Sequence, residues 1–220
     1  MKRGRTILSV LMAIATAGVM TACCNHDKSE SCSADNGRPD GLATIMQRKS
    51  VRAFAPDTIP SEVMTNILKA AMAAPTGRNI QPWRFVVLTD TSRYDEVFVG
   101  NHNMAIYKGS AAVVVLCADT TFVAPPRNQP NAAPVSSPNA LWRDDMGACT
   151  ENLLLAVEYY GYGAVWTACY PFTDRMTSVH ASLGLPATVV PYSVVAIGRP
   201  AGNDSPKDKW KPENVHYDRW

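Results

Sequence analysis

The sequence predicts an α+β domain, because segments with helical periodicity alternate with strand-like segments along its 220 residues. Three observations support this prediction. Apolar residues in 142–160 recur every three or four positions, as in an amphipathic helix. Residues 111–117 form an unbroken apolar run, which is typical of a central buried strand. A hydrophobic content of 46% and this chain length fit one globular domain with a sizeable core.

The N-terminus has the pattern of an export signal. Lys2, Arg3 and Arg5 precede an apolar stretch that is too short for a comfortable membrane span. Small residues followed by Cys23 resemble a bacterial lipoprotein signal, in which cleavage precedes the cysteine and the cysteine carries the lipid. An ordinary secretory signal cut nearby is the alternative. We therefore expect a signal peptide over 1–22 and export, with Cys23 lipid-anchored on the periplasmic or outer-membrane side of a bacterial membrane.

A polar segment separates this signal from the domain. Residues 23–40 are rich in Ser, Asp, Asn and Lys, and we interpret them as a flexible tether before a domain spanning 41–220. Cleavage would remove three basic residues and leave 18 basic against 19 acidic ones, a net charge of −1. A nearly neutral domain gives no support to nucleic-acid binding.

The cysteines favour neither disulfides nor a metal site. Cys117, Cys149 and Cys169 stand among apolar neighbours, which predicts buried free thiols. No Cys-x-x-Cys or Cys/His cluster is present in the sequence, so we expect no metal.

The predicted elements follow in order from residue 41. Residues 41–47 have helical spacing, with Leu42, Ile45 and Met46 on one face. A second helix begins at Pro60 and ends before Pro75. Its expected buried stripe consists of Val63, Met64, Ile67, Leu68, Ala71 and Met72. Residues 84–88 then have the pattern of a strand.

The second half of the chain alternates in the same way. Five prolines predict a long irregular loop over 122–140. After the helix at 142–160 we expect a strand at 164–169, a helix at 172–183 stopped by Gly184, and a strand at 188–197. The last twenty residues are polar with interspersed aromatics.

A basic run follows the first predicted helix. If the chain is extended there, Arg48, Ser50 and Arg52 point the same way while Lys49 points oppositely. Two guanidinium groups and a hydroxyl suit a phosphate, since charge-assisted hydrogen bonds are the stronger ones. A solvated basic turn is the alternative. Lys207 and Lys209, again two apart, would complete a cationic cage only if the fold brings both ends of the domain together.

A second polar run lies at 75–81. Thr76 and Gly77 allow a tight turn with the backbone close to a ligand. Asn79 and Gln81 offer donors and acceptors that suit the edge of a heteroaromatic ring, although an Asx-type turn is an alternative role for Asn79. Trp83 is expected to anchor the following strand in the core.

Four ordered motifs resemble those of the nitroreductase family of FMN-dependent oxidoreductases. They are Arg-Lys-Ser-x-Arg-x-Phe at 48–54, Ala-Pro-Thr-x-x-Asn-x-Gln-Pro-Trp-x-Phe at 74–85, Gly-Tyr-Gly-Ala-Val-Trp at 161–166 and Pro-Lys-Asp-Lys-Trp at 206–210. The resemblance extends from about residue 41 to the C-terminus. It implies a three-layer α-β-α sandwich with a central, mainly antiparallel sheet, and a homodimer with exchanged C-terminal tails and FMN at the interface.

The resemblance also implies the residues that bind FMN. The phosphate and the nearby flavin edge would meet the 48–52 run and the two tail lysines, and the 75–81 loop would lie along the ring. The flavin N5 would carry the hydride, so no side chain is expected to be catalytic, and Arg52 would support the charge of the reduced flavin. Family members often have glycine near Ala168, so contacts there are expected to differ. The full set is Arg48, Lys49, Ser50, Arg52, Pro75, Thr76, Asn79, Gln81, Asn103, Trp166, Thr167, Ala168, Lys207 and Lys209.

The activity implied by the resemblance is a ping-pong electron transfer. NADH or NADPH would reduce the flavin, and a small acceptor such as a nitroaromatic, quinone or enone would then reoxidise it. Another electron donor is the alternative for an exported enzyme, because NAD(P)H is scarce outside the cytoplasm. Two alternatives remain: an FMN-binding carrier without turnover, and a flavin-dependent dehydrogenase or dehalogenase of the same fold.

Overall fold

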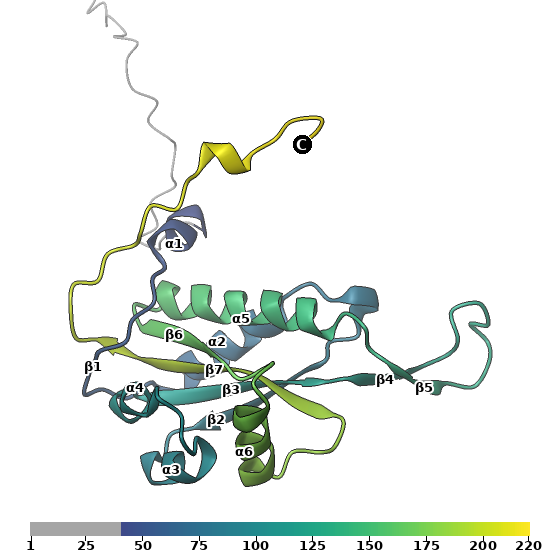
Figure 1. Ribbon diagram of the computed structural model, residues 1–220, viewed down its shortest axis with the longest axis horizontal. Coiled ribbons are helices and arrows are strands. Elements are labelled where there is room, and N and C mark those ends of the chain that lie inside the picture. Colours follow the sequence, from purple (N-terminus) through teal and green to yellow (C-terminus); the bar gives the residue numbers. More distant parts are fainter. Residues whose placement is uncertain (1–40) are drawn as a thin grey trace, which may run out of the picture. The chain divides into compact units, whose positions relative to one another are not determined.

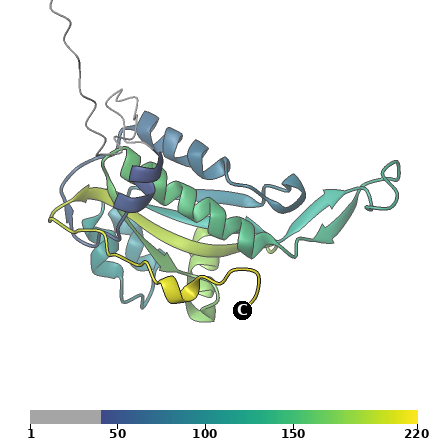
Figure 2. The same cartoon turned by 90° about the horizontal axis from the view of Figure 1, so that it is seen from above.

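In the computed structural model, residues 41–220 are described, and they form three layers with one sheet between two sets of helices (Figures 1 and 2). The predicted signal peptide at 1–22, the tether at 23–40 and the lipidation site Cys23 lie outside the described residues. Within 41–220, no helix is long and apolar enough to cross a membrane.

The central sheet is antiparallel throughout, as expected. It has the order β1 (Phe54–Ala55), β7 (Val189–Pro200), β3 (Ala112–Asp119) and β2 (Trp83–Leu88), and β6 (Gly163–Ala168) also pairs with β7. The long β7 therefore joins β3 on one side to β6 and β1 on the other. This pairing brings the two ends of the domain to one edge of the sheet.

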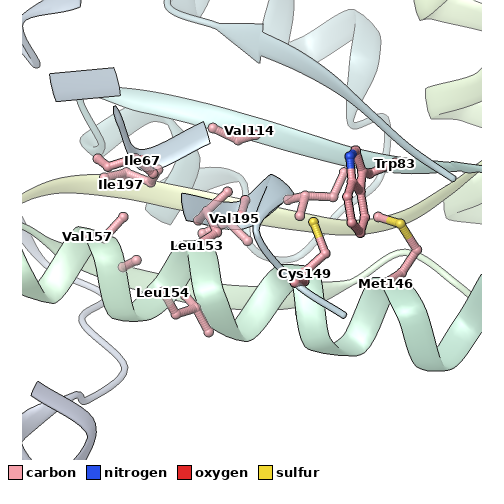
Figure 3. Packing of buried hydrophobic residues seen from close by; sticks show 14 of the residues in the cluster. Ile67, Trp83, Val114, Met146, Cys149, Leu153, Leu154, Val157, Val195 and Ile197 are labelled. Carbon is pink, nitrogen blue, oxygen red and sulfur yellow. The ribbon is translucent and has the colours of Figure 1, made fainter. Parts of the chain in front are cut away.

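Both faces of the sheet are covered, which explains the uninterrupted apolar run at 111–117. Val114 and Leu116 face α2 (Ser61–Met72) and α5 (Trp142–Tyr159), where Met146 and Leu153 complete the core (Figure 3). Alternate residues face the other way and pack against residues of α3 (Tyr94–Val97), α4 (Met104–Gly109) and α6 (Thr173–Leu183). The predicted three-layer α+β architecture is confirmed.

The first helix forms as predicted, but its apolar face is uncovered. In α1 (Gly41–Gln47), Leu42, Ile45 and Met46 are 69%, 53% and 68% exposed. Met72, at the end of the predicted buried stripe of α2, is also exposed. Helical spacing identifies a common face correctly, but it does not say whether the same chain covers that face.

The predicted irregular loop at 122–140 is wrong. Residues of β4 (Thr121–Ala124) pair antiparallel with β5 (Val135–Pro138), which makes a two-stranded hairpin. Four of its prolines lie in the connection, and Pro138 is the last residue of its strand, where a missing N–H is tolerated. The prolines correctly predicted an irregular connection. They did not predict the two short strands on either side of it.

The three described cysteines are free and buried, as predicted. Burial raises the pKa of each of these thiols to about 12. They are therefore protonated core residues at neutral pH, and none has the low pKa of a reactive nucleophile.

Candidate functional site

The 48–52 run is an extended segment that is anchored against the start of β6. The N–H of Val51 donates to the carbonyl of Ala164 at 2.9 Å, and Ser50 forms an isolated bridge with the same residue. Val51 is fully buried, whereas Ser50 and Arg52 are exposed. The expected alternation is present at residues 50–52, where the exposed Ser50 and Arg52 flank the buried Val51. It does not extend to Arg48 and Lys49, which were expected to point oppositely, because both pair with carboxylates of α5.

Two cations of this run pair with α5. Arg48 Nε lies 2.9 Å from Glu151 Oε1, and Lys49 Nζ donates to Glu158 Oε1 at 3.2 Å. The Arg48–Glu151 contact is an ion pair without hydrogen-bond geometry, so the buried Nε–H of Arg48 donates to no group within 41–220.

The C-terminal tail starts beside this run. The N–H of Ala201 donates to the carbonyl of Ala53 at 3.0 Å, immediately after β7 pairs with β1. Lys207 and Lys209 lie further along the tail, both exposed, and neither pairs with a carboxylate of the described part of the chain. The fold thus brings the two backbone segments together, and the tail then leads away from the sheet (Figure 1).

The second run lies at the other end of α5. The N–H of Gly77 donates to Oδ1 of Asp145 at 2.8 Å, and this carboxylate is 4% exposed. Three residues here have left-handed backbones, with φ of 57° at Arg78, 56° at Asn79 and 54° at Gln81. Such conformations are costly for residues with a Cβ and occur preferentially at ligand sites.

The side chains of this run also bond to one another. Gln81 Nε2 donates to Asn79 Oδ1 at 2.9 Å, so Asn79 pairs with a side chain in place of the backbone N–H of an Asx-type turn. Pro75 is exposed and Thr76 is half-buried at the entrance to the loop. The amide groups are thus positioned on a constrained, outward-facing loop.

The two runs contact different parts of α5. Asp145 holds the second run, whereas Glu151 and Glu158 contact the first. At a rise of 1.5 Å per residue, these positions on α5 are about 9 and 20 Å apart. A single ligand that contacts both runs of one chain would therefore have to span about this distance.

The predicted β6 and α4 residues are connected to one another. Thr167 Oγ1 lies 2.6 Å from the hydroxyl of Tyr107, a residue one helical turn after Asn103. The Thr167 hydroxyl also donates to the carbonyl of Val194 at 2.8 Å. Burial raises the pKa of the Tyr107 phenol, while the hydrogen bonds with Thr167 and Asn103 act against that rise. Trp166 is half-buried and packs beside Tyr192.

The carbonyl of Ala168 accepts from Arg175 Nη1 at 2.9 Å. That carbonyl and the Thr167 hydroxyl are therefore already engaged inside the fold. Contacts of these two residues with a ligand remain a prediction, and any such contact would use other atoms of this stretch.

One feature of the structure was not predicted. Two adjoining cavities, of about 440 and 280 Å³, lie between residues 77–82 and the β4–β5 hairpin; together we name them the loop–hairpin hollow. Arg78 lines both, with its guanidinium carbon 4.9 Å from the centre of the Phe122 ring. An irregular loop was expected at 122–140, but not the hairpin that forms this wall.

Comparisons with known proteins agree with this geometry. Residues 45–100 match the model of the nitroreductase family. A relative from Archaeoglobus fulgidus, described as an NADH dehydrogenase/NAD(P)H nitroreductase, is 32% identical over 81% of this chain and 98% of its own. A Bacteroides thetaiotaomicron structure of the same description superimposes with a TM-score of 0.72 at 31% identity, covering 82% of this chain and 98% of that one. A nitroreductase from Desulfovibrio desulfuricans in complex with FMN has a TM-score of 0.67 at 26% identity, with coverage of 82% and 98%.

Proposed function

The chain belongs to the nitroreductase family, and from that premise we propose that it is an FMN-dependent oxidoreductase that passes electrons from NAD(P)H to a small acceptor. The observation that carries this proposal is the anchored 48–52 run, whose donors face outward at the edge where the tail begins. Relatives described as NAD(P)H nitroreductases and a neighbour that binds FMN support the cofactor and the donor.

The donors of this edge fit the phosphate of FMN. Arg48 is paired with Glu151, and the exposed Ser50 and Arg52 flank the buried Val51 on the extended segment. Guanidinium and hydroxyl donors match phosphate oxygens in geometry and charge. Lys207 and Lys209 would add cationic donors from the tail, while Lys49 neutralises Glu158 behind the run.

FMN, when bound, would supply the redox chemistry that links the donor to the acceptor. The chain's own residues hold and tune it. Arg52 would stabilise negative charge at the edge of the ring, since a fixed cation lowers the free energy of an anion beside it. Asn79 and Gln81 would hydrogen-bond the polar edge of the ring, and the backbone of 75–77 would lie beside it.

A homodimer would bring the two separated runs together, with the 75–81 loop of one subunit beside the 48–52 run of the other. Exposed aromatic and apolar surface supports this arrangement. Trp210, Tyr217 and Trp220 of the tail are 69%, 83% and 98% exposed, and the apolar face of α1 is uncovered. Large apolar side chains are favoured at interfaces. Exchange of the tails would cover both surfaces, and sedimentation analysis at micromolar concentration tests the dimer.

The acceptor would be small, such as a nitroaromatic, quinone or enone. We further propose export, with Cys23 as the lipid-bearing residue, on the strength of the basic and apolar pattern of residues 1–22 alone. Membrane fractionation of the wild type and of Cys23→Ser tests this: the variant should leave the membrane fraction, and its retention there would refute the anchor.

The phosphate role is tested by Arg48→Ala. Losing one charge-assisted contact of about 1.5–3 kcal/mol weakens FMN binding roughly 10- to 100-fold. Arg93→Ala is the matched control, because Arg93 is exposed and bonds only to the carbonyl of Ser182 among the described residues. Fluorescence titration of flavin-free protein with FMN measures both, and equal affinities in the two variants would remove Arg48 from the phosphate site.

A further inference from the structure

We propose that the loop–hairpin hollow binds the anionic group of a small-molecule substrate, and that Arg78 is the residue that recognises it. This inference rests on the proposed function, because it names the substrate class of that enzyme. The shared chemistry is a phosphate or carboxylate, carried either by the dinucleotide donor or by the acceptor.

The charge of the hollow favours an anion. Its walls contain Arg78, Arg84 and Arg127, against Asp119 as their one carboxylate. Arg84 Nη2 bonds to Asp119 Oδ2 at 3.4 Å, which leaves the other two guanidinium groups without a carboxylate partner in residues 41–220. A concave surface with excess positive charge concentrates anionic ligands.

Arg78 is the cationic residue that lines both cavities. Its guanidinium carbon lies 4.9 Å from the centre of the Phe122 ring, and its N–H groups donate to no acceptor in the described structure. Its φ of 57° places a long cationic side chain where glycine or asparagine is usual. A costly backbone conformation that presents an unpaired cation to two cavities favours a ligand-binding role over a purely structural one.

Asn139 also lines the smaller cavity. Asn139 is 3% exposed, and its Oδ1 accepts from the N–H of Leu141 at 3.1 Å. That bond fixes the orientation of the amide, because the N–H of Leu141 requires an oxygen. Nδ2 is therefore a buried donor that lacks an acceptor in the described structure, and it lies just before the positive end of the α5 helix dipole.

The negative groups nearby do not cancel this arrangement. Asp145, the closest buried carboxylate, holds the N–H of Gly77 and lines neither cavity. The volumes of about 440 and 280 Å³ are those of small-ligand sites. A substrate with its anionic end at Arg78 would thus lie along the strained loop that is proposed to border the flavin.

Two pairs of probes test this inference by equilibrium binding to the full chain with FMN added. ADP is compared with adenosine, and 4-nitrobenzoate with 4-nitrobenzamide, so that each anion has an uncharged counterpart. At least one anion should bind roughly tenfold more tightly than its counterpart, which is the ratio expected for one charge-assisted contact. A preference for ADP assigns the hollow to the dinucleotide, and a preference for 4-nitrobenzoate assigns it to the acceptor.

Three variants complete the experiment. Arg78→Gln should abolish the preference, Arg78→Lys should keep part of it, and Arg143→Gln should keep all of it because Arg143 stacks on Trp142 outside the hollow. Equal binding of anions and neutral probes, or an unchanged preference in Arg78→Gln, would overturn the inference. Flavin content and its reduction by NAD(P)H are measured separately. If the protein binds no flavin or NAD(P)H does not reduce it, the proposed function is wrong. An anion preference that depends on Arg78 would still stand as a separate result.

Discussion

Replacing Gly163 by alanine should displace the anchor of the 48–52 run. A Cβ at Gly163 would lie 2.6 Å from Val51 Cγ2, 2.7 Å from its Cβ and 2.9 Å from its Cγ1. Rotation of the Val51 side chain cannot relieve the contact with Cβ, so the backbone that carries Ser50 and Arg52 must move. Overpacking of a buried site costs about 1–3 kcal/mol, and we expect the upper half of that range.

Urea unfolding and thermal melting measure this loss. A cost of about 2–3 kcal/mol lowers the melting temperature of a domain of this size by roughly 4–12 °C, and FMN affinity should fall with it. Gly147→Ala is the matched control: the nearest atom to its Cβ is the Tyr192 hydroxyl at 3.6 Å, and alanine within α5 should be neutral or stabilising.

A double-mutant cycle isolates the contact. Val51→Ala removes both Cγ atoms, so Gly163→Ala should cost less in that background, with a coupling of at least about 1 kcal/mol. A Gly163→Ala protein as stable as the wild type, or one whose loss is unchanged by Val51→Ala, would refute the account of how β6 positions the run.

Two further predictions concern carboxylates at opposite ends of the site. Asp145→Ala should lower the free energy of unfolding by about 1–3 kcal/mol, because it leaves the N–H of Gly77 without its acceptor, and Asp145→Asn should recover part of that loss; equal urea midpoints for Asp145→Ala and the wild type would contradict this. The pKa of Asp57 is held below its ordinary value of 3.8 by the N–H of Thr58 and by Arg199. Because the folded pKa is lowered, this carboxylate stabilises the protein above the ordinary pKa, and the stabilisation is lost as pH falls through the lowered value. The difference in urea midpoint between wild type and Asp57→Asn should therefore be full at about pH 6 and shrink below pH 3.8; a difference that does not change with pH would show that the pair contributes nothing.

The periodicity of apolar residues correctly predicted the long elements that are buried by other parts of the same chain. The helix at α5 and the apolar strand β3 are examples, because each contains enough turns or residues for its pattern to be distinctive. The short α3 and α4 and the β4–β5 hairpin contain too few residues for a pattern to emerge. The periodicity of α1 identifies its apolar face. It cannot specify whether another part of the chain covers that face.

The candidate site divides in the same way. The exposure of Ser50 and Arg52 on either side of the buried Val51 follows from the two-residue period of an extended chain, whereas Arg48 and Lys49, which were expected to point oppositely, both pair with α5. The distance between the two runs depends on where α5 packs, and the partnering of Thr167 depends on Tyr107, some sixty residues earlier. The loop–hairpin hollow combines Arg78 with a hairpin that was not foreseen, so only the fold could reveal it.

Anaerobic reduction of the purified protein tests the central claim most directly. The account predicts a yellow protein with FMN bound, whose visible flavin absorbance is bleached by NADH or NADPH and restored by a nitroaromatic or quinone. A colourless protein that fails to bind added FMN would contradict the assignment of the cofactor. A yellow protein that neither nucleotide bleaches would contradict electron transfer from NAD(P)H.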